Sequence, residues 1–331
     1  KKKKKKWVGE DVFMGLGARQ LLVYESQYGS CSKDETIDDR LVTLIRLAAE
    51  KTGQRVVILV DEYDKPMLQA IGRDELQEEY RNTLKAFYGV LKSMDGYIKF
   101  AMLTGVTKFG KVSVFSDLNQ LNDISMKSPY AALCGITKEE LVKTFLPELE
   151  RLAKRRGISL QEVIDLMERQ YDGYHFHPEG VGMFNPFSVL NAFDAEEMGY
   201  YWFQTGTPTY LVDLLKQSDY DIRLLIDGVE VLASAFSEYR AETNNPLPMI
   251  YQSGYLTIKG YDDDVKLYTL GFPNDEVRYG FLNFLVPYYT NVSNDETGFH
   301  IAKFMRELKS GDVEAFMERL KIFFSGIPYE L

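Results

Sequence analysis

The first third of the chain alternates between amphipathic helical stretches and short apolar runs. In residues 38–54 apolar side chains recur at helical spacing, which predicts a helix, and the aliphatic residues 56–60 then predict a buried strand. A long amphipathic helix over 74–96 and a second strand over 97–105 follow. The order helix, strand, helix, strand predicts an α/β domain with parallel strands, whose carboxyl ends lie along one edge of the sheet.

From Thr137 onward the pattern becomes mainly helical. Two predicted helices begin with capping boxes, Thr137 with Glu140 and Ser159 with Glu162, in which the side chains satisfy the first backbone N–H groups. We therefore expect a domain boundary near Gly135. Residues 249–271 are different, because they predict a strand, an aspartate-rich turn and a second strand, and the remaining chain is predicted to be helical.

Composition narrows the function classes. A chain of 331 residues is expected to form two or three domains, and its net charge of −10 argues against a surface that broadly coats nucleic acid. The two cysteines form no metal or disulfide framework, which favours the cytoplasm, and no apolar run approaches the length of a membrane span. The opening run of six lysines is left out of the fold prediction.

The end of the first predicted strand carries the clearest candidate chemistry. In "VVILVDEYDKPM" five aliphatic residues lead directly into Asp61 and Glu62. One interpretation is a solvated turn after a buried strand. The other is a Walker B arrangement, in which one carboxylate binds in the Mg²⁺ shell and the next lies beside the attacking water. Thr104 ends the second strand and is expected at the same edge.

A phosphate-binding loop is harder to find. The stretch "GVTKFGKV" (105–112) matches G-x-x-x-x-G-K, but Val112 stands where Ser or Thr would bind Mg²⁺, and the residues after it begin a helix poorly. We interpret it as a polar turn from which Thr104 and Lys108 would still face a γ-phosphate. The sequence therefore predicts the metal and water half of a nucleotide site without a recognisable phosphate loop.

Several longer motifs together resemble a known family. They are "VVILVDEYDKP", "NTLKAFYGVLKS", "FAMLTGVTKFGKVSVFSDLNQLNDISM", "RQYDGYHF", "FNPFSVLNAF", "YWFQTGTPTYLVDLLK" and "YTLGFPNDEVRYGFL". In this order they are similar to the predicted AAA-ATPase-like family of bacteria. The resemblance implies a P-loop NTPase-like core of the AAA or STAND type, with a parallel sheet, followed by a helical lid and a winged-helix-like segment. A nuclease-like domain often follows in such proteins.

The resemblance also implies segments and residue roles. The ATPase-like core would occupy residues 1–135, the lid 136–218, the winged-helix-like segment 219–290, and a helical linker toward a nuclease-like domain 291–331. Asp61 would hold Mg²⁺ through water, Glu62 would orient or deprotonate the attacking water, and Thr104 would be the sensor. Arg278 would reach a phosphate of ATP when the lid closes.

Two departures from the family pattern suggest that the chain is a piece of a longer ATPase. The P-loop expected before residue 35 is not recognisable, and the nuclease-like domain does not follow. Two functions consequently stay open. The chain is an ATP-binding, Mg²⁺-dependent switch that signals to a C-terminal effector, or it is a degenerate ATPase fold that acts as a scaffold and binds protein or DNA.

Three weaker patterns have structural interpretations that we prefer. His175 and His177 could ligate a metal, but loop hydrogen bonds explain them better, since no cysteine lies near. Asp264 and Lys266 resemble a nuclease acid and lysine, yet their stretch "YDDDVK" predicts a hairpin tip. The aromatic residues in 199–210 could stack on bases, although core packing accounts for them too.

Overall fold

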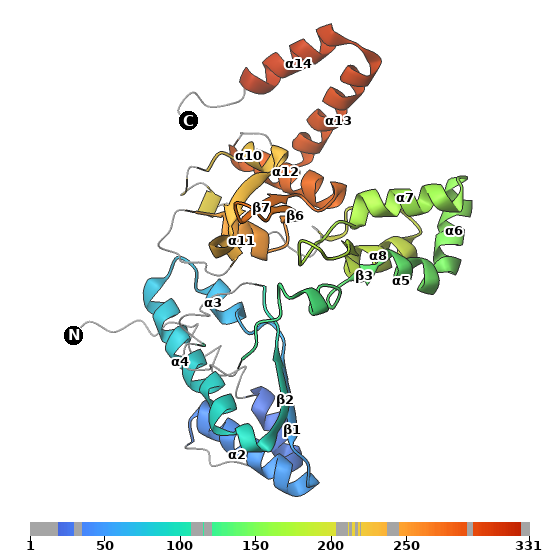
Figure 1. The fold of residues 1–331 in the computed structure, drawn as a ribbon. Helices are drawn as coiled ribbons and strands as arrows, with labels where there is room; N and C mark the ends of the chain where they lie inside the picture. Colours follow the sequence, from blue (N-terminus) through green and yellow to red (C-terminus); the bar gives the residue numbers. More distant parts are fainter. Residues whose placement is uncertain are drawn as a thin grey trace, which may run out of the picture. The chain divides into compact units, whose positions relative to one another are not determined.

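The computed structural model describes residues 19–29, 35–106, 115, 121–202, 211, 214–215, 218, 220–236, 245–289 and 294–325. The chain divides into two compact units (Figure 1). Unit 1 comprises residues 1–123 and 235–243, and unit 2 comprises 124–234 and 244–331. Each unit is described separately below. Lys108, which was predicted to face a phosphate, lies outside the described residues.

Unit 1 contains the predicted helices and parallel strands. The elements follow in the order α2 (Ile37–Thr52), β1 (Val56–Val60), α3 (Lys65–Gln69), α4 (Asp74–Ser93) and β2 (Ile98–Leu103). The two strands pair in parallel, as the sequence predicted, and Val60 lies opposite Leu103. Helix α3 was not predicted from the sequence, in which no element was assigned to these residues.

The two faces of this small sheet differ strongly. One face packs on Ile45 of α2, on Val90 of α4 and on Met94, which follows α4, and Figure 1 shows both helices beside the strands. On the other face Leu59 is 72% exposed, and Val57 and Phe100 are 51% exposed. Parallel sheets are usually covered on both faces, so this outer face exposes an unusual amount of apolar surface.

Unit 2 begins with four helices around a common core. They are α5 (Lys138–Thr144), α6 (Leu146–Arg156), α7 (Leu160–Tyr171) and α8 (Pro186–Ala195), with the short antiparallel pair β3 (Ile136–Thr137) and β4 (Met183–Phe184). Both predicted capping boxes are present, so the starts of α5 and α7 are confirmed. The fully buried side chains of this core include Leu141, Leu149, Val163, Met167, Tyr171 and Val189.

The second part of unit 2 is a three-stranded antiparallel sheet with flanking helices. Its strands are β5 (Val229–Leu232), β6 (Thr257–Asp262) and β7 (Leu267–Gly271), in the order β5-β7-β6. The predicted hairpin tip is confirmed, because the chain turns between Asp262 and Leu267. The start of the predicted first strand is wrong, since Leu247–Gln252 forms helix α11. A further short helix, α10 (Leu224–Asp227), precedes β5.

Helices complete the described chain, as predicted. Helix α12 (Asp275–Tyr289) follows the hairpin directly, and α13 (Asn294–Ser310) and α14 (Val313–Ser325) follow it. Arg319 donates to both carboxylate oxygens of Glu307, at 2.8 and 2.9 Å, and this pair ties α14 to α13. None of the helices in the described ranges has the length and apolar character needed to cross a membrane.

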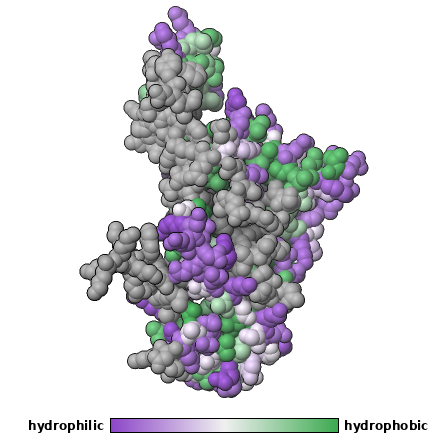
Figure 2. All heavy atoms as spheres, turned by 90° about the vertical axis from the view of Figure 1, so that its left-hand side faces the viewer, coloured by the Kyte–Doolittle hydropathy of each residue, from purple (hydrophilic) through white to green (hydrophobic). Residues whose placement is uncertain are grey.

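The overall class of the fold is therefore mixed α/β, with a small parallel sheet and many helices. The surface mixes polar and apolar groups, and Figure 2 shows hydrophilic side chains with smaller hydrophobic areas between them on one face. This mixture agrees with a chain that is 27% charged and 45% hydrophobic.

Candidate functional site

The carboxyl ends of β1 and β2 are joined by three hydrogen bonds. The backbone N–H of Thr104 donates to the carbonyl oxygen of Val60 at 2.8 Å, and the carbonyl oxygen of Thr104 accepts from the N–H of Tyr63 at 2.8 Å. The Thr104 hydroxyl donates to Oδ1 of Asp61. Parallel pairing therefore continues past the strand ends and places two of the predicted site residues, Asp61 and Thr104, in direct contact.

Glu62 lies next to this contact in an unusual backbone conformation. Its φ angle of 55° is in the left-handed region, which residues other than glycine rarely adopt and which is often found at functional sites. Its side chain is 51% exposed and forms an ion pair with Lys65, with 2.6 Å between Oε2 and Nζ. The hydrogen bond and the charge of Glu62 raise the pKa of the Lys65 ammonium. Such an exposed pair stabilises little, so Glu62 can leave it readily.

The third acid of the motif, Asp64, has a different environment. It is 1% exposed, and its Oδ1 accepts a hydrogen bond from the backbone N–H of Val106 at 3.2 Å. The hydroxyl groups of Tyr63 and Tyr88 have a raised pKa, first because they are buried and second because of the negative charge of Asp64. Sequence reasoning gave Asp64 no role, because nothing in three neighbouring acids indicates which one is buried.

Gly105 completes the junction between the two strand ends. A Cβ atom at this position would lie 2.6 Å from Oδ1 of Asp64 and 2.6 Å from Cε1 of Tyr63, closer than real Cβ contacts allow. The close approach of the two loops thus depends on a residue without a side chain. A glycine directly after an apolar strand was the one sequence signal that could have predicted this packing.

The residues at the strand ends fit a magnesium ion held by a single carboxylate. Asp61 is exposed, and no described residue donates to its second oxygen, Oδ2. Mg²⁺ typically takes one or two carboxylates and completes its shell with phosphate oxygens and water. Among the described residues, no group of three or more His, Cys, Asp or Glu side chains could hold a metal ion by itself.

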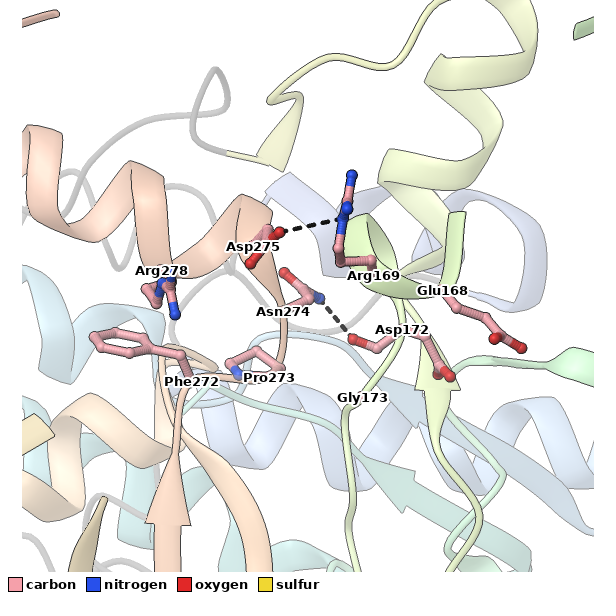
Figure 3. A pocket seen from close by; sticks show the side chains of 9 residues that line it. All are labelled: Glu168, Arg169, Asp172, Gly173, Phe272, Pro273, Asn274, Asp275 and Arg278. Carbon is pink, nitrogen blue, oxygen red and sulfur yellow. Dashed lines mark hydrogen bonds and ion pairs between the residues drawn. The ribbon is translucent and has the colours of Figure 1, made fainter. Parts of the chain in front are cut away.

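Arg278, the remaining predicted site residue, belongs to unit 2. It lines a pocket of about 330 Å³ at the start of α12, together with Glu168, Arg169, Asp172, Gly173, Phe272, Pro273, Asn274 and Asp275 (Figure 3). Arg169 pairs with Asp275 at 3.5 Å, and the Asn274 amide donates to the carbonyl oxygen of Asp172 at 2.9 Å. Burial raises the pKa of the Asp172 carboxyl.

Unit 2 also contains a fully enclosed carboxylate, Glu276, which sequence reasoning missed. It is 0% exposed and accepts hydrogen bonds from the hydroxyl of Ser188 at 2.7 Å and from the N–H groups of Tyr201 at 2.6 Å and Trp202 at 3.0 Å. Burial raises the pKa of its carboxyl, although the three donors act in the opposite direction. Glu276 therefore connects α12 to α8 and to the segment before residue 203.

The weaker sequence patterns have structural explanations where they are described. The His175 ring bonds the carbonyl oxygen of Gly180 at 3.0 Å, and the ring of His177 accepts from the N–H of Glu179 at 3.2 Å. These are the loop hydrogen bonds that we preferred to a metal pair. Three of the aromatic residues in 199–210 pack in unit 2: Tyr200 on Tyr279, Tyr201 against Tyr171, and Trp202 against Tyr255.

Comparison with known proteins finds a matching family and a relative, and no solved structure matches the chain. Residues 12–115 match the model of the family described as predicted AAA-ATPase. The chain is 40% identical over 269 residues to the uncharacterized protein in the vnfD 5′ region of Azotobacter chroococcum mcd 1. That alignment covers 80% of this chain and 49% of the relative, so the chain spans about half the length of the protein it matches. The matched family segment contains Asp61, Glu62 and Thr104.

Proposed function

We propose that this chain, whose residues 12–115 match the model of the predicted AAA-ATPase family, is an ATP-binding, Mg²⁺-dependent NTPase module. The observation that carries the proposal is the hydrogen bond from the Thr104 hydroxyl to Asp61, formed where two adjacent parallel strands end. In open α/β sheets, ligands bind outside the carboxyl ends of the strands. The exposed carboxylates of Asp61 and Glu62 lie at that edge of unit 1.

Each residue of the strand-end site has a distinct role in this proposal. Asp61 would hold Mg²⁺ through water with its second oxygen, and Thr104 would keep the carboxylate oriented through the first. Bound Mg²⁺ would offset the negative charge of the phosphates. Glu62 would orient a water molecule toward the γ-phosphorus and accept its proton while the bond between that phosphorus and the leaving oxygen of ADP breaks.

The ion pair between Glu62 and Lys65 gives this mechanism a resting state. The Glu62 oxygen that bonds the Lys65 ammonium is not available to a water molecule, so Glu62 has to leave Lys65 before this oxygen can accept a proton from water. Both side chains are more than half exposed, which makes this exchange inexpensive. Nucleotide binding and hydrolysis would then switch the helical and winged-helix-like segments and signal to a C-terminal effector.

The decisive experiment is calorimetric titration of Mg²⁺-ATP into the full-length protein. We expect saturable binding that weakens at least tenfold in Asp61→Ala and less in Thr104→Val, because Asp61 supplies the metal contact and Thr104 only orients it. Asp95→Ala is the matched control, since this exposed aspartate precedes β2 instead of following it. Binding that is absent, or equal in Asp61→Ala and wild type, would favour the degenerate scaffold.

Hydrolysis is tested by replacing the proposed base. Glu62→Gln removes the proton acceptor but keeps the size of the side chain, so turnover should fall about a hundredfold or more while Mg²⁺-ATP binding remains. Retained turnover would show that Glu62 is not the base. The predicted phosphate contacts of Lys108 and Arg278 call for separate variants, Lys108→Ala and Arg278→Ala, each expected to weaken ATP binding.

A further inference from the structure

The buried carboxylate of Asp64 has no part in the mechanism proposed above. It is 1% exposed, although it lies only three residues after the exposed Asp61. Removing a carboxylate from water is costly unless polar partners replace the lost hydration. One such partner is the backbone N–H of Val106, at 3.2 Å from Oδ1, and it comes from the loop that follows the other strand.

The direction of this bond is informative because Asp64 is the N-cap residue of α3. Aspartate at an N-cap usually accepts a hydrogen bond from the first N–H groups of its own helix. Asp64 makes no such side-chain bond, and its carboxylate bonds the loop after β2 instead. A local helix cap is thus absent, and a contact between residues 42 positions apart is present in its place.

Three features at this position restrain the same short loop. Asp64 holds the N–H of Val106, Tyr63 donates its N–H to the carbonyl of Thr104, and the lack of a side chain at Gly105 lets both residues come close. The backbone around Thr104 is therefore held at two points. The N–H of Thr104 donates to the carbonyl oxygen of Val60, and the N–H of Val106, two residues later, donates to Asp64. Its hydroxyl then points at Asp61.

We propose that Asp64 is a positioning residue for the contact between Asp61 and Thr104. By bonding the Val106 N–H it holds the loop after β2 against the turn after β1, so that the Thr104 hydroxyl stays on the carboxylate that would hold Mg²⁺. The inference rests on the proposed function for its effect on turnover. The restraint on the loop can be measured without nucleotide.

The test compares Asp64→Asn with Asp64→Ala in the full-length protein. Asparagine keeps an oxygen that can accept from Val106, whereas alanine removes it. Amide hydrogen exchange without nucleotide should become faster at Val106 in Asp64→Ala and stay close to wild type in Asp64→Asn. With Mg²⁺-ATP, kcat should fall about tenfold in Asp64→Ala, and binding of Mg²⁺-ATP should weaken no more than in Thr104→Val, because the misplaced hydroxyl only orients the carboxylate that would hold Mg²⁺.

Two further variants serve as a control and as an alternative to Asp64→Ala. Asp74→Ala removes an exposed acid at the start of α4 in the same unit and should change neither exchange at Val106 nor kcat. Gly105→Ala keeps the Asp64 carboxyl group but displaces it from the loop, so this variant tests the proposal if Asp64→Ala does not fold. It should reproduce both effects of Asp64→Ala.

Three results would overturn the proposal. The first is amide hydrogen exchange at Val106 that is as slow in Asp64→Ala as in the wild type. The second is a wild-type kcat in Asp64→Ala despite faster exchange at Val106. The third is a loss of turnover in Asp64→Asn as large as that in Asp64→Ala. If the wild-type protein does not hydrolyse ATP, the proposed function is wrong, and so is the proposed effect of Asp64 on turnover. That failure is distinguishable, because a defect confined to Asp64→Ala leaves the proposed function intact.

Discussion

Asp61 and Glu276 both connect separate parts of the chain through hydrogen bonds, but their surroundings are opposite. Asp61 is exposed at the end of β1 and accepts from one hydroxyl, that of Thr104. Glu276 is 0% exposed and accepts from three donors of unit 2. A carboxylate with an open oxygen can bind a metal ion, whereas an enclosed one with three partners can only hold the fold together. The difference separates a candidate site from a structural anchor.

The largest effect is expected at the enclosed carboxylate. Glu276→Ala leaves the hydroxyl of Ser188 and the N–H groups of Tyr201 and Trp202 without their acceptor in a buried place. We expect a loss of about 3 kcal/mol in the free energy of unfolding of unit 2. Chemical denaturation monitored by circular dichroism measures it. A loss as small as that of a surface variant would mean that Glu276 is not an anchor.

A smaller loss in the free energy of unfolding is expected for Gly105→Ala, at the junction of the two strand ends. In Gly105→Ala the new methyl group would lie 2.6 Å from Asp64 and Tyr63, and the loops have to move apart to admit it. Overpacking of this kind costs about 2 kcal/mol. Denaturation of the variant measures the cost, and Gly96→Ala is the matched control because its Cβ would meet nothing within 4 Å. Equal stability of the two variants would contradict the crowded junction.

The raised pKa of Glu276 gives unit 2 a dependence on pH. Burial favours the protonated carboxyl in the folded state, so its contribution is fully present below the ordinary pKa of glutamate and is lost as pH rises through the raised value. The free energy of unfolding should fall across that window, by at most about 1.4 kcal/mol per pH unit from this one group. Denaturation midpoints at successive pH values measure the slope.

Glu276→Gln sharpens this prediction because glutamine has a similar shape and does not titrate. Its oxygen can still accept from Tyr201 and Trp202, and the Ser188 hydroxyl can turn to accept from its amide. The fall in stability across the acidic range should therefore be reduced in this variant. If wild type and variant lose stability in parallel, another group causes the dependence.

The smallest effect on stability is expected at Asp61 itself. Asp61→Ala removes an exposed side chain with one described hydrogen bond, so the free energy of unfolding should change by less than about 0.5 kcal/mol. Thermal unfolding of the variant, measured without nucleotide, tests this. A loss comparable to that of Glu276→Ala would mean that Asp61 is also a structural anchor.

The sequence predicted the open carboxylate and missed the enclosed ones for a physical reason. Strand β1 is a continuous apolar run and β2 is apolar apart from Lys99, so their ends, and with them Asp61 and Thr104, can be located from the pattern alone. The partners of Glu276 are 74 to 88 residues away, and no local pattern shows which donors will surround it. An acid in the first turn of a helix is ordinarily interpreted as a solvated charge that favours the helix dipole.

Local rules also explain which elements were predicted well. Capping boxes fixed the starts of α5 and α7, because side chain and backbone bond within four residues. The short helices α3 and α11 were missed, although each has a proline in its first turn, a position that proline favours. Their neighbours in sequence suggested a turn and a strand, and at five and six residues they are too short to show a helical period.

The uncovered face of the parallel sheet has a practical consequence for purification. Val57, Leu59 and Phe100 form an apolar area on a sheet that has two strands, and hence two unpaired edges, within the described residues, and such surfaces tend to associate with one another. We therefore expect the protein to aggregate through this face as its concentration rises. Replacing Leu59 by lysine should then improve the yield of dispersed protein.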